Sequence, residues 1–134
     1  MNLELLVPLL ITSILTIFGW YILNRLTKKR DQENKKRELR IEYLIDAWTK
    51  LEYASNRNIN EIEFIEYIEK PLAAIQLFGT LNQINFAKKI AEEIANNGQT
   101  SLDSILESLR KDLRKELNLE KTNSEMKYIR FKKE

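Results

Sequence analysis

Residues 5–23 read LLVPLLITSILTIFGWYIL, a run of 19 residues without a charged side chain. As an α-helix rising about 1.5 Å per residue, this run would span about 28 Å, which is close to the thickness of a bilayer's hydrocarbon core. Apolar side chains would cover all of its faces, so the helix must be buried in protein or in lipid. The remaining chain, about 110 residues, is too short to enclose it, so residues 1–24 are predicted to form a transmembrane anchor.

A cleaved signal peptide is the main alternative to a retained anchor. Such a peptide has a positively charged start and a cleavage site made of small residues. Here Glu4 is the only charged side chain before the run, and Asn24-Arg25-Leu26 follows it. These features favour a retained helix. Within it, three hydroxyl side chains are expected to donate to carbonyls of their own helix, which makes them tolerable in lipid: Thr12, Ser13 and Thr16.

The residues after the anchor predict its orientation. Residues 25–40 hold eight Lys and Arg against three acidic side chains. Because basic residues near a membrane end stay on the cytoplasmic side, the C-terminal part is predicted to be cytoplasmic and the N-terminus outside. The absence of Cys fits a reducing compartment. The side chains expected at the membrane interface are Trp20, Tyr21, Arg25, Lys28, Lys29 and Arg30.

Charge is distributed unevenly along the rest of the chain. The stretch 25–40 has a net charge of +5, residues 41–120 have −5, and residues 121–134 have +3. We therefore divide the chain after the anchor into a basic juxtamembrane helix (25–40), a helical bundle domain (41–120) and a flexible basic tail (121–134). A domain of this size is marginally stable unless its helices pack well or bind a partner.

The pattern of apolar residues is typical of helices throughout. Only three Gly and two Pro occur, and no sustained alternation indicates a strand. The fold class is predicted to be all-α, with the N-terminal transmembrane helix continuing into a small cytoplasmic bundle of about four helices. The first expected helix ends near Ser55, and the second covers 62–78 with a kink or break at Pro71. The third starts with a capping box at Thr80 and Gln83 and ends at Asn97-Gly98. The fourth starts at Thr100 or Ser101 and ends before Asn118.

The composition excludes several kinds of catalytic site. The chain has no His and no Cys, which removes the commonest metal ligands, the usual general base and the thiol nucleophile. Four carboxylates at helical spacing are candidates for a cation site: Glu61, Glu63, Glu66 and Glu69. A solvated helix face, with Glu66 paired to Lys70, explains them better. We predict no catalytic residue, no cofactor, no metal and no small-molecule substrate.

A basic quartet on the last predicted helix is the candidate contact for a partner or a lipid: Arg110, Lys111, Arg114 and Lys115. Such a patch suits phosphate groups. Acidic residues interrupt it, and no aromatic side chains alternate with it as a base-stacking surface would require, so nucleic acid is not expected. An ordinary charged helix surface is the simpler interpretation.

Two short motifs carry a resemblance. Leu77-Phe78-Gly79-Thr80 combines a helix stop with a cap, and Leu109-Arg110-Lys111-Asp112-Leu113 lies in a late helix. With the anchor and the basic helix before them, the chain resembles uncharacterised small bacterial single-pass membrane proteins with a cytoplasmic helical domain. The resemblance covers residues 39–118. It implies an all-α fold in the bacterial inner (plasma) membrane and assigns no activity.

These patterns together favour a non-enzymatic protein-interaction module, an adaptor or scaffold that is anchored by one helix and binds a protein partner or a second copy. The alternative is a membrane-perturbing effector of a stress, toxin or defence system, which would require the anchors to associate. An enzyme acting on a membrane substrate is a third hypothesis, and it would depend on Glu63, Glu66 and Asp112.

Overall fold

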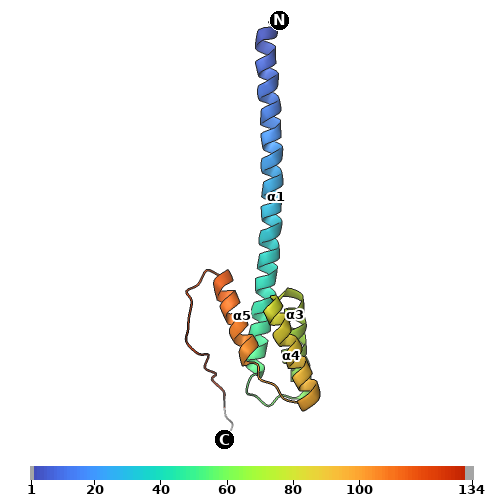
Figure 1. Ribbon diagram of the computed structural model, residues 1–134, viewed down its shortest axis with the longest axis vertical. Helices are drawn as coiled ribbons and strands as arrows, with labels where there is room; N and C mark the ends of the chain where they lie inside the picture. The colour runs from blue at the N-terminus through green and yellow to red at the C-terminus, as the bar shows by residue number, and fades with distance from the viewer. Residues whose placement is uncertain (1, 132–134) are drawn as a thin grey trace. The chain divides into compact units, whose positions relative to one another are not determined.

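The computed structural model describes residues 2–131, and every regular element in that range is helical (Figure 1). Four helical stretches follow one another, which confirms the all-α prediction. The second stretch is continuous but changes type within it. The elements are α1 (Leu3–Ala54), then α2 (Glu61–Phe64), η1 (Ile65–Glu69) and α3 (Lys70–Phe78) without a gap, α4 (Leu81–Asn97) and α5 (Asp103–Glu116).

The chain divides into two compact units, one up to Glu38 and one from Leu39 onward. The first consists of the N-terminal part of α1, which includes a window long and apolar enough to cross a membrane and has none of that window buried. The hydroxyl groups of Thr12, Ser13 and Thr16 donate to the carbonyls four residues earlier, as expected. The distances are 2.8 Å for Thr12, 2.9 Å for Ser13 and 2.8 Å for Thr16.

The second unit has its own apolar core, to which α1, α3, α4 and α5 all contribute. Their apolar positions recur at helical spacing, so each helix presents one apolar stripe to the others. Trp48 is half-buried against this core and donates its indole N–H to the Leu106 carbonyl at 3.2 Å. The fully buried side chains include Leu44, Leu51, Ile75, Ile105, Leu106 and Leu109.

Pro71 interrupts the regular helix in the way that its chemistry requires. The prolyl ring collides with the preceding turn, and its nitrogen has no hydrogen to donate. The chain responds with a π-helical turn, η1, in which the Lys70 N–H donates to the Ile65 carbonyl five residues earlier. The helix then continues through α3. The wider turn makes room for the ring, so the predicted interruption is a change of helix type and not a chain break.

The capping box predicted for α4 is present. The Thr80 hydroxyl accepts from the Gln83 N–H at 3.3 Å, and the Gln83 side chain accepts from the Thr80 N–H at 2.9 Å. Gly98 ends α4 in the left-handed conformation with φ of 68°. Both features follow from residues within one turn of each other, which is why the sequence alone predicted them.

The cap predicted for α5 is wrong. The N-cap is Leu102, whose side chain has no polar group, although the Ser101 hydroxyl accepts from the Asp103 N–H at 3.4 Å. The Thr100 hydroxyl donates instead to Glu93 at 2.7 Å. Leu102 is buried in the core, so tertiary packing fixes where this helix begins.

Candidate functional site

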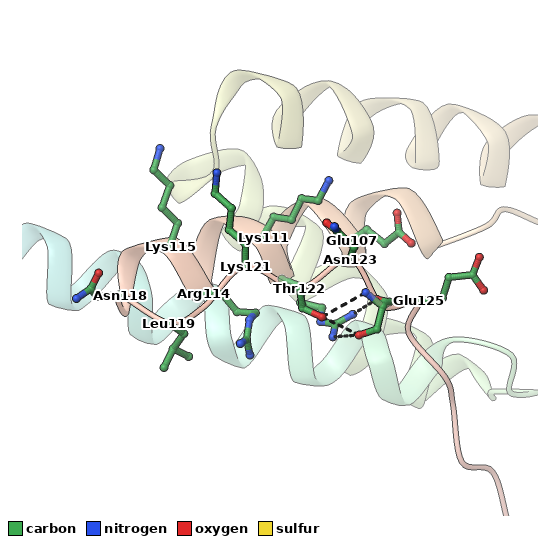
Figure 2. A pocket seen from close by; sticks show the side chains of 12 residues that line it. Glu107, Lys111, Arg114, Lys115, Asn118, Leu119, Lys121, Thr122, Asn123 and Glu125 are labelled. Carbon is green, nitrogen blue, oxygen red and sulfur yellow. Dashed lines mark hydrogen bonds between the residues drawn. The ribbon is translucent and has the colours of Figure 1, made fainter.

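A groove of about 650 Å³ lies between the C-terminal half of α5 and the chain that follows it (Figure 2). We call it the basic groove. All four residues of the predicted basic quartet line it, and Lys121 adds a fifth cation. Two carboxylates, Glu107 and Glu125, also line it, so the cations exceed the anions by three. The other lining residues are Asn118, Leu119, Thr122, Asn123 and Ser124.

Helical spacing on α5 sorts the quartet into two pairs. Residues four apart share a face, so Arg110 lies beside Arg114, and Lys111 lies beside Lys115. Leu109 and Leu113 are buried in the core and fix the rotation of the helix. The arginines are half-buried, whereas the lysines are exposed.

The two arginines bind the protein's own backbone. Arg110 donates through Nη1 to the Ser124 carbonyl at 2.9 Å. Arg114 donates through Nε and Nη2 to the Glu120 carbonyl at 3.1 Å and 2.9 Å. These bonds hold residues 120–124 against α5. Half of the quartet therefore forms a wall of the groove, and its guanidinium groups are already engaged.

The three lysines of the groove remain without a partner. Lys111, Lys115 and Lys121 make no hydrogen bond or ion pair with any residue in the range 2–131. Figure 2 shows their side chains extending to the same side of the view, opposite to Arg114. Sequence reasoning missed Lys121, because nothing in the local pattern indicated that the tail turns back to α5.

The tail returns antiparallel along α5 and is fixed again farther on. The Tyr128 hydroxyl donates to Asp103 Oδ1 at 3.1 Å, and Arg130 donates to the Ser55 carbonyl at 2.9 Å and to Glu52 Oε1 at 3.0 Å. Partial burial of the phenol, and then the neighbouring Asp103 carboxylate, raise the pKa of Tyr128. The described part, 121–131, has no helix or strand. Its predicted flexibility stays a prediction, and 132–134 lie outside the described residues.

A second polar cluster joins the two motifs of the resemblance. Arg40 donates through Nε to the Phe78 carbonyl at 2.8 Å and through Nη2 to Asp112 Oδ2 at 2.6 Å. Gln83 donates to the same oxygen at 3.0 Å. The helix stop after Phe78 and the acidic residue of α5 thus meet at one arginine. We call these residues the Arg40 cluster; it connects α1, α3, α4 and α5.

Of the four carboxylates considered as a cation site, Glu66 forms ordinary ion pairs. Glu66 accepts from Lys70 at 2.5 Å and from Lys50 at 3.0 Å, and these two ammonium groups lower the pKa of Glu66. The pKa of Lys50 is raised, chiefly by its hydrogen bond to Glu66. Among the described residues no group of three acidic side chains could hold a metal ion. The predicted pairing of Glu66 with Lys70 is confirmed.

The predicted membrane-interface residues all belong to the first unit. Trp20 and Tyr21 are exposed on α1, as are the basic side chains after them, Arg25, Lys28, Lys29 and Arg30.

An exposed apolar patch lies in the second unit at the turn between α3 and α4. Tyr43 stacks on Phe78 with ring centroids 4.9 Å apart, which places it beside this turn. Leu77 and Leu81 flank the turn, and each is 75% exposed. We call Tyr43, Leu77 and Leu81 the turn patch.

No family model matches the chain, and comparisons with curated proteins and with solved structures gave no match.

Proposed function

We propose that this protein is a single-pass membrane protein whose helical body is a non-enzymatic adaptor for another protein. One observation carries the proposal. No side chain of the uncharged run 5–23 is buried, whereas the second unit has a core of its own. A helix that is apolar on all sides and that no protein covers is stabilised by lipid.

The basic stretch 25–40 supports a cytoplasmic position for the body. With the resemblance to small bacterial membrane proteins, we place the anchor in a bacterial inner membrane, with the N-terminus outside. Each Lys or Arg near an anionic leaflet contributes about 1 kcal/mol, so the interface lysines and arginines would also hold this stretch at the headgroups.

The turn patch supports binding to a protein. Leu77 and Leu81 are exposed in a small domain whose other leucines mostly lie in the core. Adjacent exposed apolar side chains of this kind mark interaction surfaces more often than single ones do. Tyr43 adds an aromatic ring to them, a residue type that is enriched at protein interfaces.

The membrane-perturbing alternative receives less support from the same structure. It would require the anchors to associate through polar groups inside the span. Thr12, Ser13 and Thr16 already donate their hydroxyl hydrogens to their own helix. We therefore favour the adaptor.

Extraction and topology test the anchor. Alkaline carbonate should leave the full-length protein in the membrane pellet, and a reporter fused after Glu134 should be active only in the cytoplasm. Release of the intact protein into the supernatant, or activity of a reporter that works only outside the cytoplasm, would contradict the proposal.

Site-specific photocrosslinking in intact membranes tests the adaptor function. A photoreactive residue at Leu77 should give one dominant protein adduct, and Leu81→Gln should abolish that adduct. The same photoreactive residue at Ile62, which is 80% exposed but lies on α2, is the matched control and should give none. A protein that gives no adduct from position 77, or equal adducts from both positions, does not use the turn patch to bind a partner.

A further inference from the structure

The basic groove has properties that an anchored adaptor does not require. It combines a concave shape, an excess of positive charge and three lysines that have no partner among residues 2–131, all within one unit of the chain. Its volume of about 650 Å³ lies within the range common for sites that hold small ligands.

Ordinary helix electrostatics explain only part of this charge. Basic residues in the last turn of a helix interact favourably with its dipole, and Arg114 and Lys115 occupy that turn of α5. Lys111 lies one turn earlier, and Lys121 lies in the tail. These two lysines have no such explanation.

The nearby carboxylates do not neutralise the lysines. Glu107 and Glu125 line the groove but form no ion pair with a described residue. Glu116, next to Lys115, is 3.8 Å from Arg40 Nη1 in the Arg40 cluster. The groove therefore keeps an unbalanced positive charge that an anionic ligand can use.

We infer that the basic groove binds a phosphate-bearing anion through Lys111, Lys115 and Lys121. Lysine binds phosphate as a point charge, and a phosphomonoester carries close to two negative charges with three acceptor oxygens. The hydroxyl groups of Thr122 and Ser124 border the same groove and share one hydrogen bond at 2.7 Å, so one hydroxyl hydrogen of the pair is left to donate to a ligand. Arg110 and Arg114 act as positioning residues, because they hold the tail that brings Lys121 to α5.

The phosphate group can belong to either of two ligands, a free polyphosphate in solution or a lipid headgroup, and the lysines would bind both by the same chemistry. Nucleic acid is not favoured, because no aromatic side chain lines the groove. The lysines are exposed on flexible stems, so binding is expected to weaken as salt is added.

Acetylation rates of individual lysines, measured by mass spectrometry, test the inference and separate the two sources. Full-length protein is placed in phosphatidylcholine nanodiscs, and sodium pyrophosphate is added in one arm. In the other arm the nanodiscs contain phosphatidic acid, whose headgroup is a phosphomonoester. We expect acetylation of Lys111, Lys115 and Lys121 to slow at least threefold in one arm, while Lys88 on α4 is unaffected. Slowing with pyrophosphate indicates a free ligand; slowing with phosphatidic acid alone indicates a lipid.

A charge-matched pair of variants completes the test. The triple variant Lys111→Gln, Lys115→Gln, Lys121→Gln should bind the active probe about tenfold more weakly, which corresponds to about 1.4 kcal/mol. The control triple Lys88→Gln, Lys89→Gln, Lys127→Gln removes the same charge elsewhere and should bind as the parent does. All six positions are exposed, so both variants should keep the unfolding temperature. If neither probe slows the acetylation of Lys111, Lys115 and Lys121, or if the two triple variants bind the probe equally well, the inference is overturned.

Discussion

The two units of this chain use the same apolar residues in opposite ways. Leu15 in the first unit is 65% exposed, whereas Leu109 in the second is fully buried. Both sit in helices, so local conformation does not distinguish them. What differs is what surrounds them: neighbouring helices cover Leu109, whereas no part of the protein buries Leu15, for which the proposed function supplies lipid. An apolar side chain is stabilised wherever water is removed from it.

Their basic residues differ in a parallel way. Lys28 in the first unit is exposed, whereas Arg40 in the second donates hydrogen bonds to two other helices, α3 and α5. Under the proposed function, charge in the first unit would act collectively at the membrane surface, where an individual residue matters little. In the second unit single charged groups have specific partners. Substitutions matched between the units can therefore test this contrast.

The largest effect is expected from truncating a core leucine. Leu109→Ala should lower the free energy of unfolding of the second unit by about 2–5 kcal/mol, because it removes buried methyl groups and leaves a cavity. Thermal unfolding of the full-length protein in detergent, followed by near-ultraviolet circular dichroism, measures it. Leu15→Ala is the matched control and should leave the transition in place; equal losses would abolish the contrast between the units.

A charge inside the anchor should act on insertion and not on folding. Ile14→Arg should make membrane insertion less favourable by about 2.5–3.5 kcal/mol, since the guanidinium must lie near the middle of the bilayer. A glycosylation-based insertion assay gives this free energy. Ile45→Arg, on an exposed position of the second unit, should insert like the parent. Unchanged insertion of the Ile14 variant would exclude lipid as the medium around this helix.

The two units should also differ in their tolerance of a methyl group on glycine. A Cβ on Gly79 would lie 2.5 Å from the Ile75 carbonyl oxygen, whereas one on Gly19 would meet nothing within 4 Å. Gly79→Ala is expected to cost about 1–3 kcal/mol, in the range of other overpacked sites. Gly19→Ala should cost nothing. Thermal unfolding of both variants decides, and a neutral Gly79→Ala would show that the tight turn between α3 and α4 is adaptable.

Removing the guanidinium of the Arg40 cluster should have a moderate effect. Arg40→Gln loses charge-assisted bonds to Asp112 and to the Phe78 carbonyl, and we expect a loss of about 1–2 kcal/mol. Lys28→Gln should change the stability of the second unit by less than about 0.5 kcal/mol. Urea unfolding of the two variants measures the difference. A silent Arg40→Gln would mean that the apolar core alone joins these helices.

The smallest effect concerns the tail and depends on pH. The raised pKa of Tyr128 means that the docked tail favours the neutral phenol over the phenolate. Its contribution is complete below the ordinary pKa of 10.0 and is lost as the pH rises through the raised pKa. Tyr128→Phe should cost about 0.5–1.5 kcal/mol at pH 8, through the lost bond to Asp103. That difference should shrink above pH 10. A constant difference in unfolding temperature between pH 8 and pH 11 would show that the hydroxyl does not hold the tail.

Features that depend on neighbours within one turn were predictable. The capping box at Thr80 and Gln83, the left-handed Gly98 and the left-handed Asn118, with φ of 55°, all follow from local chemistry. So did the pair Glu66 and Lys70 at a spacing of four. The periodicity of apolar residues likewise predicted the helices.

Features that join distant segments were not predictable from one sequence. Arg40 and Asp112 are 72 positions apart, and Arg130 and Glu52 are 78 apart. No periodicity relates such residues, because their meeting depends on how the helices pack and on the path of the loops. The cap of α5 was missed for the same reason, since the burial of Leu102 outweighs the local preference for Ser or Thr.

The sequence by itself determined that residues 5–23 lack charge and that the chain is helical, because both depend on residue types and on spacing within a turn or two. Only the tertiary structure decided which cations are engaged. Arg110 and Arg114 bind backbone carbonyls of the returning tail, whereas Lys111 and Lys115 have no partner among the described residues. In the sequence these four side chains are equivalent members of one basic patch. The fold distinguishes them because the tail brings its carbonyl oxygens within hydrogen-bonding distance of the arginines on α5 and not of the lysines.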